Sequence, residues 1–149
     1  MNRKIKILVI IVVLIIIGVI IIRGFINNNK KVIICVDAGH GGTDVGATNE
    51  NRYEKNDTLK VARLVREYLE QEDIKVIMTR TDDITCTLQE RCKIANKKKA
   101  DLFVSLHRNS ADTGNGIETW INSKQSEEDI ELATNVMNYI GKTKIQNDR

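Results

Sequence analysis

The two histidines of the chain each follow closely on an apolar run that predicts a strand. His40 stands between glycines, four residues beyond the run 32–36, and His107 comes one residue after the run 102–106. In open parallel sheets, ligands gather just beyond the carboxyl ends of the strands. Neighbouring or near-neighbouring strands would bring both imidazoles to one edge of the sheet. Because imidazole is a common metal ligand, the pair indicates a metal site.

A third ligand is needed, since catalytic zinc typically takes three protein ligands and keeps a fourth position for water. Glu54 is the best candidate because it opens the first predicted helix, next to the glycine-rich loop. The helix dipole equally favours an acid in a first turn, so a purely structural role stays open. Glu50 and Asp44 are weaker rivals in the same loop. The three glycines beside His40 (residues 39, 41 and 42) can take positive φ and present its imidazole with little steric cover.

Two other chemistries fit the sequence less well. Residues 39–44 depart from the dinucleotide-binding pattern, because Asp44 stands where the last glycine is needed, and the loop lacks the lysine of a phosphate-binding loop. A cysteine nucleophile needs an exposed thiol beside a histidine. Cys35 lies inside an apolar strand, and Cys86 and Cys92 have no histidine near them in sequence. A disulfide between Cys86 and Cys92 stays open.

The pattern of apolar residues predicts alternating strands and helices after residue 31. The predicted strands are 31–36, 74–79, 102–106 and 116–122. The predicted helices are 54–71, 87–98 with a capping box at its start, and one from residue 126 with a buried stripe of Ile130, Ala133, Val136 or Met137, and Ile140. This order predicts a three-layer α/β domain, with helices on both faces of a mainly parallel sheet.

The first 26 residues differ from the rest. Residues 7–22 are all apolar or glycine and follow Arg3, Lys4 and Lys6. In length, this run lies between the hydrophobic region of a secretory signal peptide and a full membrane-spanning helix. No small-residue cleavage site follows it. We therefore predict a transmembrane helix, an uncleaved single-pass anchor in the cytoplasmic membrane with its N-terminus inside; cleavage and secretion are the alternative. Residues 27–31 form a linker, and residues 32–149 the exported domain.

The basic isoelectric point comes from the predicted anchor. Four of the 23 basic residues lie within residues 1–26, which leaves 19 basic against 20 acidic residues for the remainder. This balanced charge is not typical of nucleic-acid binding, and we interpret the one basic cluster, residues 97–99, as the solvated end of a helix. We expect a monomer without a nucleic-acid partner.

Six separated blocks of the sequence stand in a familiar order: VDAGHGGTDVGA, YEKNDTLKVA, VIMTRTDD, LQERCKIAN, ADLFVSLHRNS and GIETWIN. With these blocks, residues 31–149 resemble the zinc-dependent N-acetylmuramoyl-L-alanine amidases of the type-3 class. The resemblance implies a peptidoglycan substrate and hydrolysis of the amide between N-acetylmuramic acid and the L-alanine of the stem peptide. A zinc-activated water is the implied nucleophile.

The resemblance places the family's zinc ligands on His40, Glu54 and His107, the same residues that position and chemistry favour. Other residues of the matched blocks are implied to support the site. These are Asn109 and Ser110 at the substrate rim, Arg80 and Arg91 as structural ion-pair partners, and Asp37 as the acceptor that orients His40 or caps the turn.

The six matched blocks do not include the one that carries the catalytic base of the family. In the family this glutamate stands in a late block resembling VELGF, which the sequence does not contain. We therefore expect the amidase domain to be incomplete at its C-terminus, with Glu118 of GIETW as a weak candidate for the base. Two hypotheses follow: a membrane-anchored amidase, or an inactive remnant that binds zinc and peptidoglycan. Some membrane-tethered relatives act in sporulation, and the anchor permits that role.

Overall fold

The computed structural model describes residues 31–110 and 116–141, which divide into a first unit ending at Asn109 and a second beginning at Ser110. The predicted anchor and nearly all of the predicted linker lie outside these residues. Within the described ranges, no helix is both long and apolar enough to cross a membrane.

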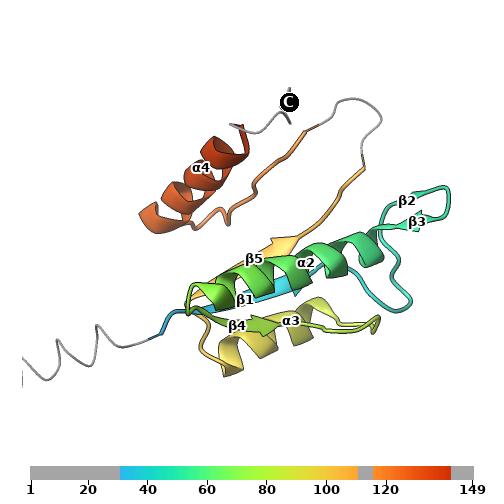
Figure 1. The fold of residues 1–149 in the computed structure, drawn as a ribbon, viewed down its shortest axis with the longest axis horizontal. Coiled ribbons are helices and arrows are strands. Elements are labelled where there is room, and N and C mark those ends of the chain that lie inside the picture. The colour runs from blue at the N-terminus through green and yellow to red at the C-terminus, as the bar shows by residue number, and fades with distance from the viewer. Residues whose placement is uncertain (1–30, 111–115, 142–149) are drawn as a thin grey trace, which may run out of the picture. The chain divides into compact units, whose positions relative to one another are not determined.

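The first unit is built around a three-stranded parallel sheet (Figure 1). β1 (Ile33–Ala38) is the central strand and pairs with β4 (Lys75–Met78) on one side and β5 (Leu102–Leu106) on the other. In this register Val36 lies beside both Met78 and Val104. Five of the six residues of β1 are buried, as expected for a strand covered on both faces. All three predicted strands of this unit are confirmed, with small shifts at their ends.

Helices cover both faces of this sheet. One face packs on α2 (Glu54–Gln71), and the core there consists of Ile34, Val36, Ala38 and Ala62, with Leu59, Val65 and Leu69 half-buried around it. Side chains alternate along a strand, so Asp37 points to the opposite face. There its carboxylate meets Arg91 of α3 (Leu88–Lys97). The predicted arrangement of helices on both faces is therefore confirmed for this unit.

The local signal at the start of α3 is reproduced. The Thr87 side chain accepts from the Glu90 backbone N–H (3.2 Å), and Glu90 accepts from the Thr87 N–H (2.8 Å), which completes the predicted capping box.

The loop before α2 contains a small hairpin of β2 (Thr48–Asn49) and β3 (Arg52–Tyr53) that the sequence does not predict. Strands of two residues are too short to show an alternating pattern.

The second unit contains α4 (Glu127–Gly141), and its predicted start is confirmed. The predicted strand at residues 116–122 is wrong: these residues pair with no strand in the described part of the chain, and a strand forms only where a neighbour accepts its backbone hydrogen bonds. Of the predicted stripe, Ala133 and Met137 are half-buried, whereas Ile130 and Val136 are exposed. The side chain of Ile140 lies outside the described residues.

Candidate metal centre

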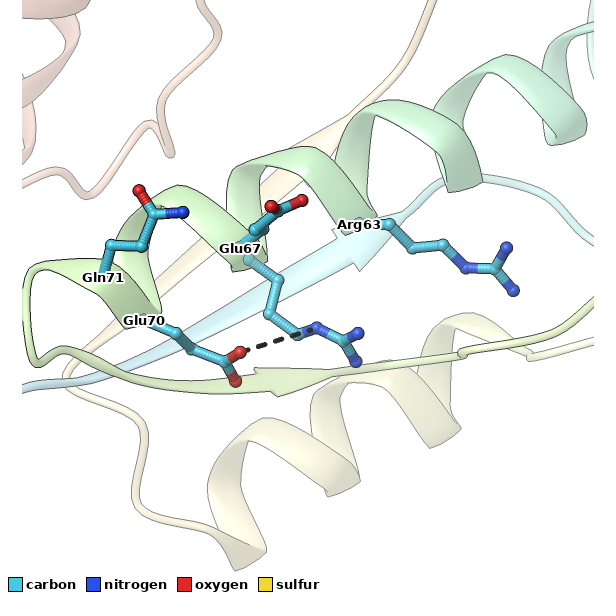
Figure 2. A pocket seen from close by; sticks show the side chains of 5 residues that line it. Arg63, Glu67, Glu70 and Gln71 are labelled. Atoms are coloured by element: carbon cyan, nitrogen blue, oxygen red, sulfur yellow. Dashed lines mark ion pairs between the residues drawn. The ribbon is translucent and has the colours of Figure 1, made fainter.

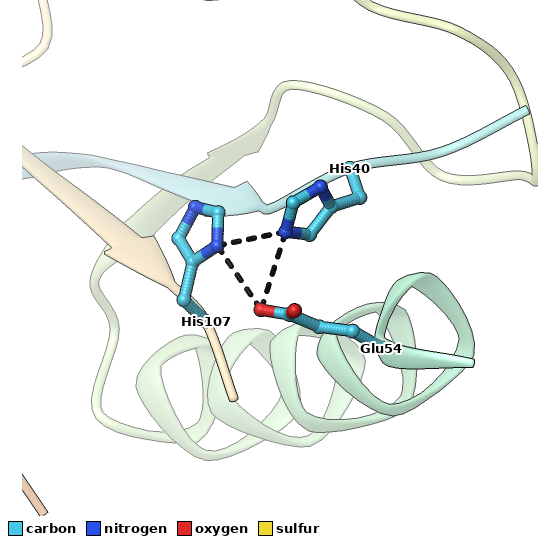
Figure 3. A group of neighbouring side chains, drawn as sticks. All are labelled: His40, Glu54 and His107. Atoms are coloured by element: carbon cyan, nitrogen blue, oxygen red, sulfur yellow. Dashed lines mark hydrogen bonds and ion pairs between the residues drawn. The ribbon is translucent and has the colours of Figure 1, made fainter. Parts of the chain in front are cut away.

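Three predicted ligands meet beyond the carboxyl ends of β1 and β5 (Figure 3). His40 Nε2 lies 3.2 Å from Glu54 Oε1 and 3.2 Å from His107 Nδ1. His107 Nδ1 and Glu54 Oε1 are also 3.2 Å apart, so the three atoms form an equilateral triangle. The strands that precede the histidines are direct neighbours, which is the arrangement on which the sequence prediction depends.

The hydrogen bonds of His40 indicate what belongs at the centre of this triangle. His40 Nδ1 lies 2.9 Å from Asp44 Oδ2, and a carboxylate can only accept, so Nδ1 carries the proton. When His40 is neutral, as a metal ligand must be, Nε2 presents a lone pair toward the carboxylate oxygen of Glu54. Two acceptors at this distance repel each other, and a cation between them removes the repulsion.

The dimensions of the triangle suit zinc. Tetrahedral zinc with bonds of about 2.0–2.2 Å separates its ligand atoms by about 3.3–3.6 Å, close to the 3.2 Å spacing of these three atoms. Two histidines and a glutamate are a standard donor set for catalytic zinc. The Glu54 side chain is only 3% exposed, whereas that of His107 is 42% exposed. The triangle is therefore open to solvent on the side of His107, where a fourth ligand can enter.

The backbone around Glu54 holds its side chain as an anion. Burial raises the pKa of Glu54, but the N–H groups of Arg108, Ala47 and Asn109 and the charge of His40 outweigh burial and lower this pKa to about 2. The Arg108 N–H donates to Oε1 (2.7 Å), and the Ala47 N–H donates to Oε2 (2.8 Å). Glu54 is thus a carboxylate at neutral pH, as a metal ligand must be.

The glycines give the two imidazoles their space. His40 itself has φ of +61°, followed by Gly41 at +131° and Gly42 at +58°. Of the three glycines that can take positive φ, Gly39 does not use this freedom. Gly39 is required for another reason: a Cβ there would lie 2.5 Å from Cε1 of the His107 ring. A Cβ on Gly46 would lie equally close to Cδ2 of His40, a contact that the sequence did not reveal.

The prediction that Asp37 orients His40 is wrong, because Asp37 lies within β1 and points away from the loop. Its carboxylate accepts from Thr79 Oγ1 (2.5 Å), Arg91 Nη1 (2.5 Å) and Ser105 Oγ (2.7 Å). Asp44, considered only as a rival ligand, is the acceptor for His40. The turn that closes between Gly41 and Asp44 brings it there. Glu50, the other rival, is exposed in the turn of the β2–β3 hairpin.

The two arginines in the matched blocks differ from each other. Arg91 forms the predicted ion pair, with Asp37. Arg80 does not: among the described contacts its guanidinium donates to four backbone carbonyls and to the hydroxyl of Thr58.

Cys35 is buried, and burial together with Asp37 raises its pKa to about 11, so it is no nucleophile. Cys86 and Cys92 are free thiols rather than a disulfide.

The other predicted site residues are less well connected to the triangle. The backbone N–H of Asn109 lies 3.4 Å from Glu54 Oε1, and Asn109 has φ of +52°. Ser110 and Glu118 belong to the second unit, where Glu118 Oε2 accepts from Trp120 Nε1 (3.0 Å). Their roles at the rim or as the base stay predictions.

A shallow hollow elsewhere on the first unit has no part in this centre. It lies along the C-terminal half of α2, whereas Glu54 is the first residue of that helix. Charged and polar side chains line it: Arg63, Arg66, Glu67, Glu70 and Gln71 (Figure 2). Arg66 Nε and Glu70 Oε2 form a loose ion pair across it at 3.9 Å.

The fold and the triangle together define an α/β protein with a group of three side chains that could hold a metal ion at the edge of a parallel sheet. The sequence pattern of the N-acetylmuramoyl-L-alanine amidases matches residues 34–149, and the chain belongs to this family. The family resemblance inferred from the six sequence blocks is thereby confirmed.

Individual relatives agree with this assignment. The chain is 43% identical over 86 residues to the amidase AmiC of Escherichia coli, an overlap of 56% of this chain and 21% of that protein. It is 41% identical over 92 residues to the sporulation-specific amidase of Bacillus subtilis, or 60% of this chain and 36% of that protein. A solved amidase of Clostridium difficile is 37% identical with a TM-score of 0.74, covering 80% of this chain and 68% of that one.

The matches cover only part of each relative. The matched part of the chain spans about half or less of the length of its curated relatives. It covers 53% of the first of these proteins, 21% of AmiC and 36% of the sporulation-specific amidase. Fold and family membership rest on the matched residues themselves.

Proposed function

We propose that the chain is a zinc-dependent peptidoglycan amidase that hydrolyses the amide between N-acetylmuramic acid and L-alanine. The observation that carries this proposal is the 3.2 Å triangle of His40, Glu54 and His107 in a member of the amidase family. We further propose that residues 1–26 anchor a monomer in the cytoplasmic membrane, with the domain on the cell-wall side.

Each residue of the centre has a defined part in this function. When bound, zinc would polarise the scissile carbonyl and lower the pKa of a water ligand to about 7. Glu54 offers a permanently ionised oxygen, because backbone N–H groups of Ala47 and Arg108 hold its charge. Asp44 keeps the proton of His40 on Nδ1, so that Nε2 faces the metal position. His107, on the exposed side, borders the position where the substrate amide would approach.

One observation supports the second candidate, a protein that binds zinc and peptidoglycan without hydrolysis. Glu118 is the base candidate offered by the sequence, and its Oε2 is engaged with the indole N–H of Trp120. That oxygen, which a general base would use to take a proton, already accepts a hydrogen bond. General-base catalysis typically contributes about 10²–10⁴ in rate, so its absence would leave little activity.

Labelling of new amino termini separates the two candidates. The full chain, purified in mild detergent, is incubated with cell wall or spore cortex in the presence of zinc. An amidase exposes the α-amino group of L-alanine on released stem peptides, and a chelator abolishes the signal. Zinc-dependent co-sedimentation with the wall without new amino termini supports the binding protein. Absence of both hydrolysis and binding would overturn the proposed function.

Asp44→Ala is expected to weaken zinc binding. Losing the partner that fixes a histidine ligand typically costs about 10–100-fold in metal affinity. Asp44→Asn should lie between this variant and wild type, since its amide oxygen can still accept from His40 Nδ1. Competition with a chelating dye measures the affinity. Equal affinity for all three proteins would show that Asp44 does not orient His40.

Gly39→Ala is expected to weaken zinc binding through the other histidine. The added Cβ would displace the His107 ring, because it would lie within 2.8 Å of three ring atoms. A shift of this kind should cost on the order of ten-fold or more in affinity, as the loss of a supporting contact does. The same chelator competition measures it, and the melting temperature reports whether the fold is kept. A folded Gly39→Ala protein with wild-type affinity would contradict the described packing.

A further inference from the structure

The backbone that carries His40 needs external support. His40 occupies the left-handed region at φ of +61°, which residues with a Cβ adopt only when their surroundings impose it. Gly41 and Gly42 follow with positive φ and add freedom rather than stiffness. The contacts of the preceding carbonyl groups show where the support comes from.

Two buried guanidinium groups hold three consecutive carbonyls at this point. Arg80 donates to the carbonyls of Ala38 (Nε, 2.9 Å) and Gly39 (Nη2, 2.9 Å). Arg91 donates to those of Ala38 (Nη1, 2.8 Å) and His40 (Nη2, 2.8 Å). Arg80 is 2% exposed and Arg91 5% exposed, so neither contacts solvent to any extent. Hydrogen bonds from charged donors are among the strongest in proteins.

Arg80 also reaches the element that carries Glu54. Its Nη2 donates to the carbonyl of Lys55 (2.8 Å) and lies 3.2 Å from Thr58 Oγ1, both in the first turns of α2. The Thr58 hydroxyl in turn donates to the carbonyl of Gly39 (2.8 Å). One guanidinium therefore fixes the loop of His40 against the helix that begins at Glu54.

Arg91 makes the equivalent connection to the strand that carries His107. It is paired with Asp37 Oδ1, and Asp37 Oδ2 accepts from Ser105 Oγ. Ser105 belongs to β5 and stands two residues before His107. Each arginine thus joins the His40 loop to the element of one other ligand.

We infer that Arg80 and Arg91 are positioning residues that set the distances among His40, Glu54 and His107. This inference rests on the proposed metal centre but concerns residues that do not touch the metal position. A lysine at either place carries the same charge, yet a single ammonium cannot reproduce the fork that spans neighbouring carbonyls. Charge-conserving substitution therefore tests geometry rather than electrostatics.

The experiment uses Co²⁺ as the probe, because its visible absorption bands report the ligand arrangement without any catalytic assay. Wild type should bind one Co²⁺ per chain, and Glu54→Gln should not. If wild type binds no Co²⁺, or if Glu54→Gln binds it equally well, the proposed metal centre and this inference are both overturned. Arg80→Lys and Arg91→Lys, shown by circular dichroism to be folded, should bind Co²⁺ on the order of ten-fold more weakly, with shifted bands. Arg63→Lys is the matched control and should match wild type, since the contacts of Arg63 within the described ranges are with the exposed residues Thr81 and Asp82.

Wild-type bands and affinity in both folded lysine variants would overturn the positioning role while leaving the metal centre intact. If either variant fails to fold, Ser105→Ala and Thr58→Val decide the matter, because they remove the hydroxyls that make the connections and keep both arginines. A measurable loss of Co²⁺ affinity or a band shift in these variants supports the inference, and unchanged values for both overturn it.

Discussion

Glu54→Gln is expected to lower zinc affinity on the order of a thousand-fold, beyond the 10–100-fold that loss of an outer partner costs. Glutamine is neutral, and its amide has one oxygen where Glu54 uses two. In the native chain Oε1 accepts from the Arg108 N–H and Oε2 from the Ala47 N–H. Glutamine must turn an N–H₂ group toward one of these donors, so ligand charge and ligand orientation are lost together. Chelator competition measures the affinity, and release of new amino termini from the wall should vanish with it.

Glu50→Gln is the matched control for this prediction. It makes the same chemical change four residues earlier, at an acid in the exposed hairpin turn. This variant should keep wild-type affinity and wild-type hydrolysis. If Glu54→Gln retains zinc as wild type does, Glu54 is not a ligand, and a different acid must complete the site.

The three candidate ligands were predictable because strand ends are visible in the sequence. The runs 32–36 and 102–106 are nearly continuous in apolar residues, which is typical of buried parallel strands. Chain direction then fixes on which edge the following residues lie. The start of α2 at Glu54 was equally visible from its apolar periodicity, and the bounds of that helix are those predicted.

The supporting contacts were not predictable, because they depend on turns rather than on patterns. Asp44 reaches His40 through a turn closed by two backbone hydrogen bonds between Gly41 and Asp44, which no periodicity reveals. Asp37 was favoured for its nearness in sequence, but alternation along β1 places its carboxylate on the opposite face of the sheet. Arg80 was expected to find a carboxylate and instead satisfies backbone carbonyls.

The prediction at residues 116–122 failed for a different reason. Their apolar content resembles that of a strand, yet strand formation depends on a partner far away in sequence, whereas helices satisfy their own backbone hydrogen bonds. The capping residues of α4 are local signals, and this helix was accordingly found.

Asp37→Ala is expected to lower the free energy of unfolding by about 3–5 kcal/mol, the range for a buried ion pair that loses one partner. The Asp37 and Arg91 side chains are 4% and 7% exposed, so the charge left on Arg91 cannot be hydrated well. The hydroxyls of Thr79 and Ser105 lose their acceptor in the same step. Because the network joins the ends of all three strands, the loss should appear as global destabilisation. Chemical denaturation of the full chain, followed by circular dichroism, measures it.

Asp82→Ala is the matched control, since it also removes an aspartate that faces an arginine. Asp82 and Arg63 are 76% and 52% exposed and lie 3.8 Å apart, and surface pairs of this kind contribute at most about 1 kcal/mol. The two variants therefore differ in burial rather than in chemistry. A small loss in both would mean that Arg91 finds compensation without Asp37 through the carbonyls of Ala38 and His40, which it already contacts. A large loss for Asp37→Ala alone would establish the buried pair as the part of the network on which the sheet under the metal centre depends.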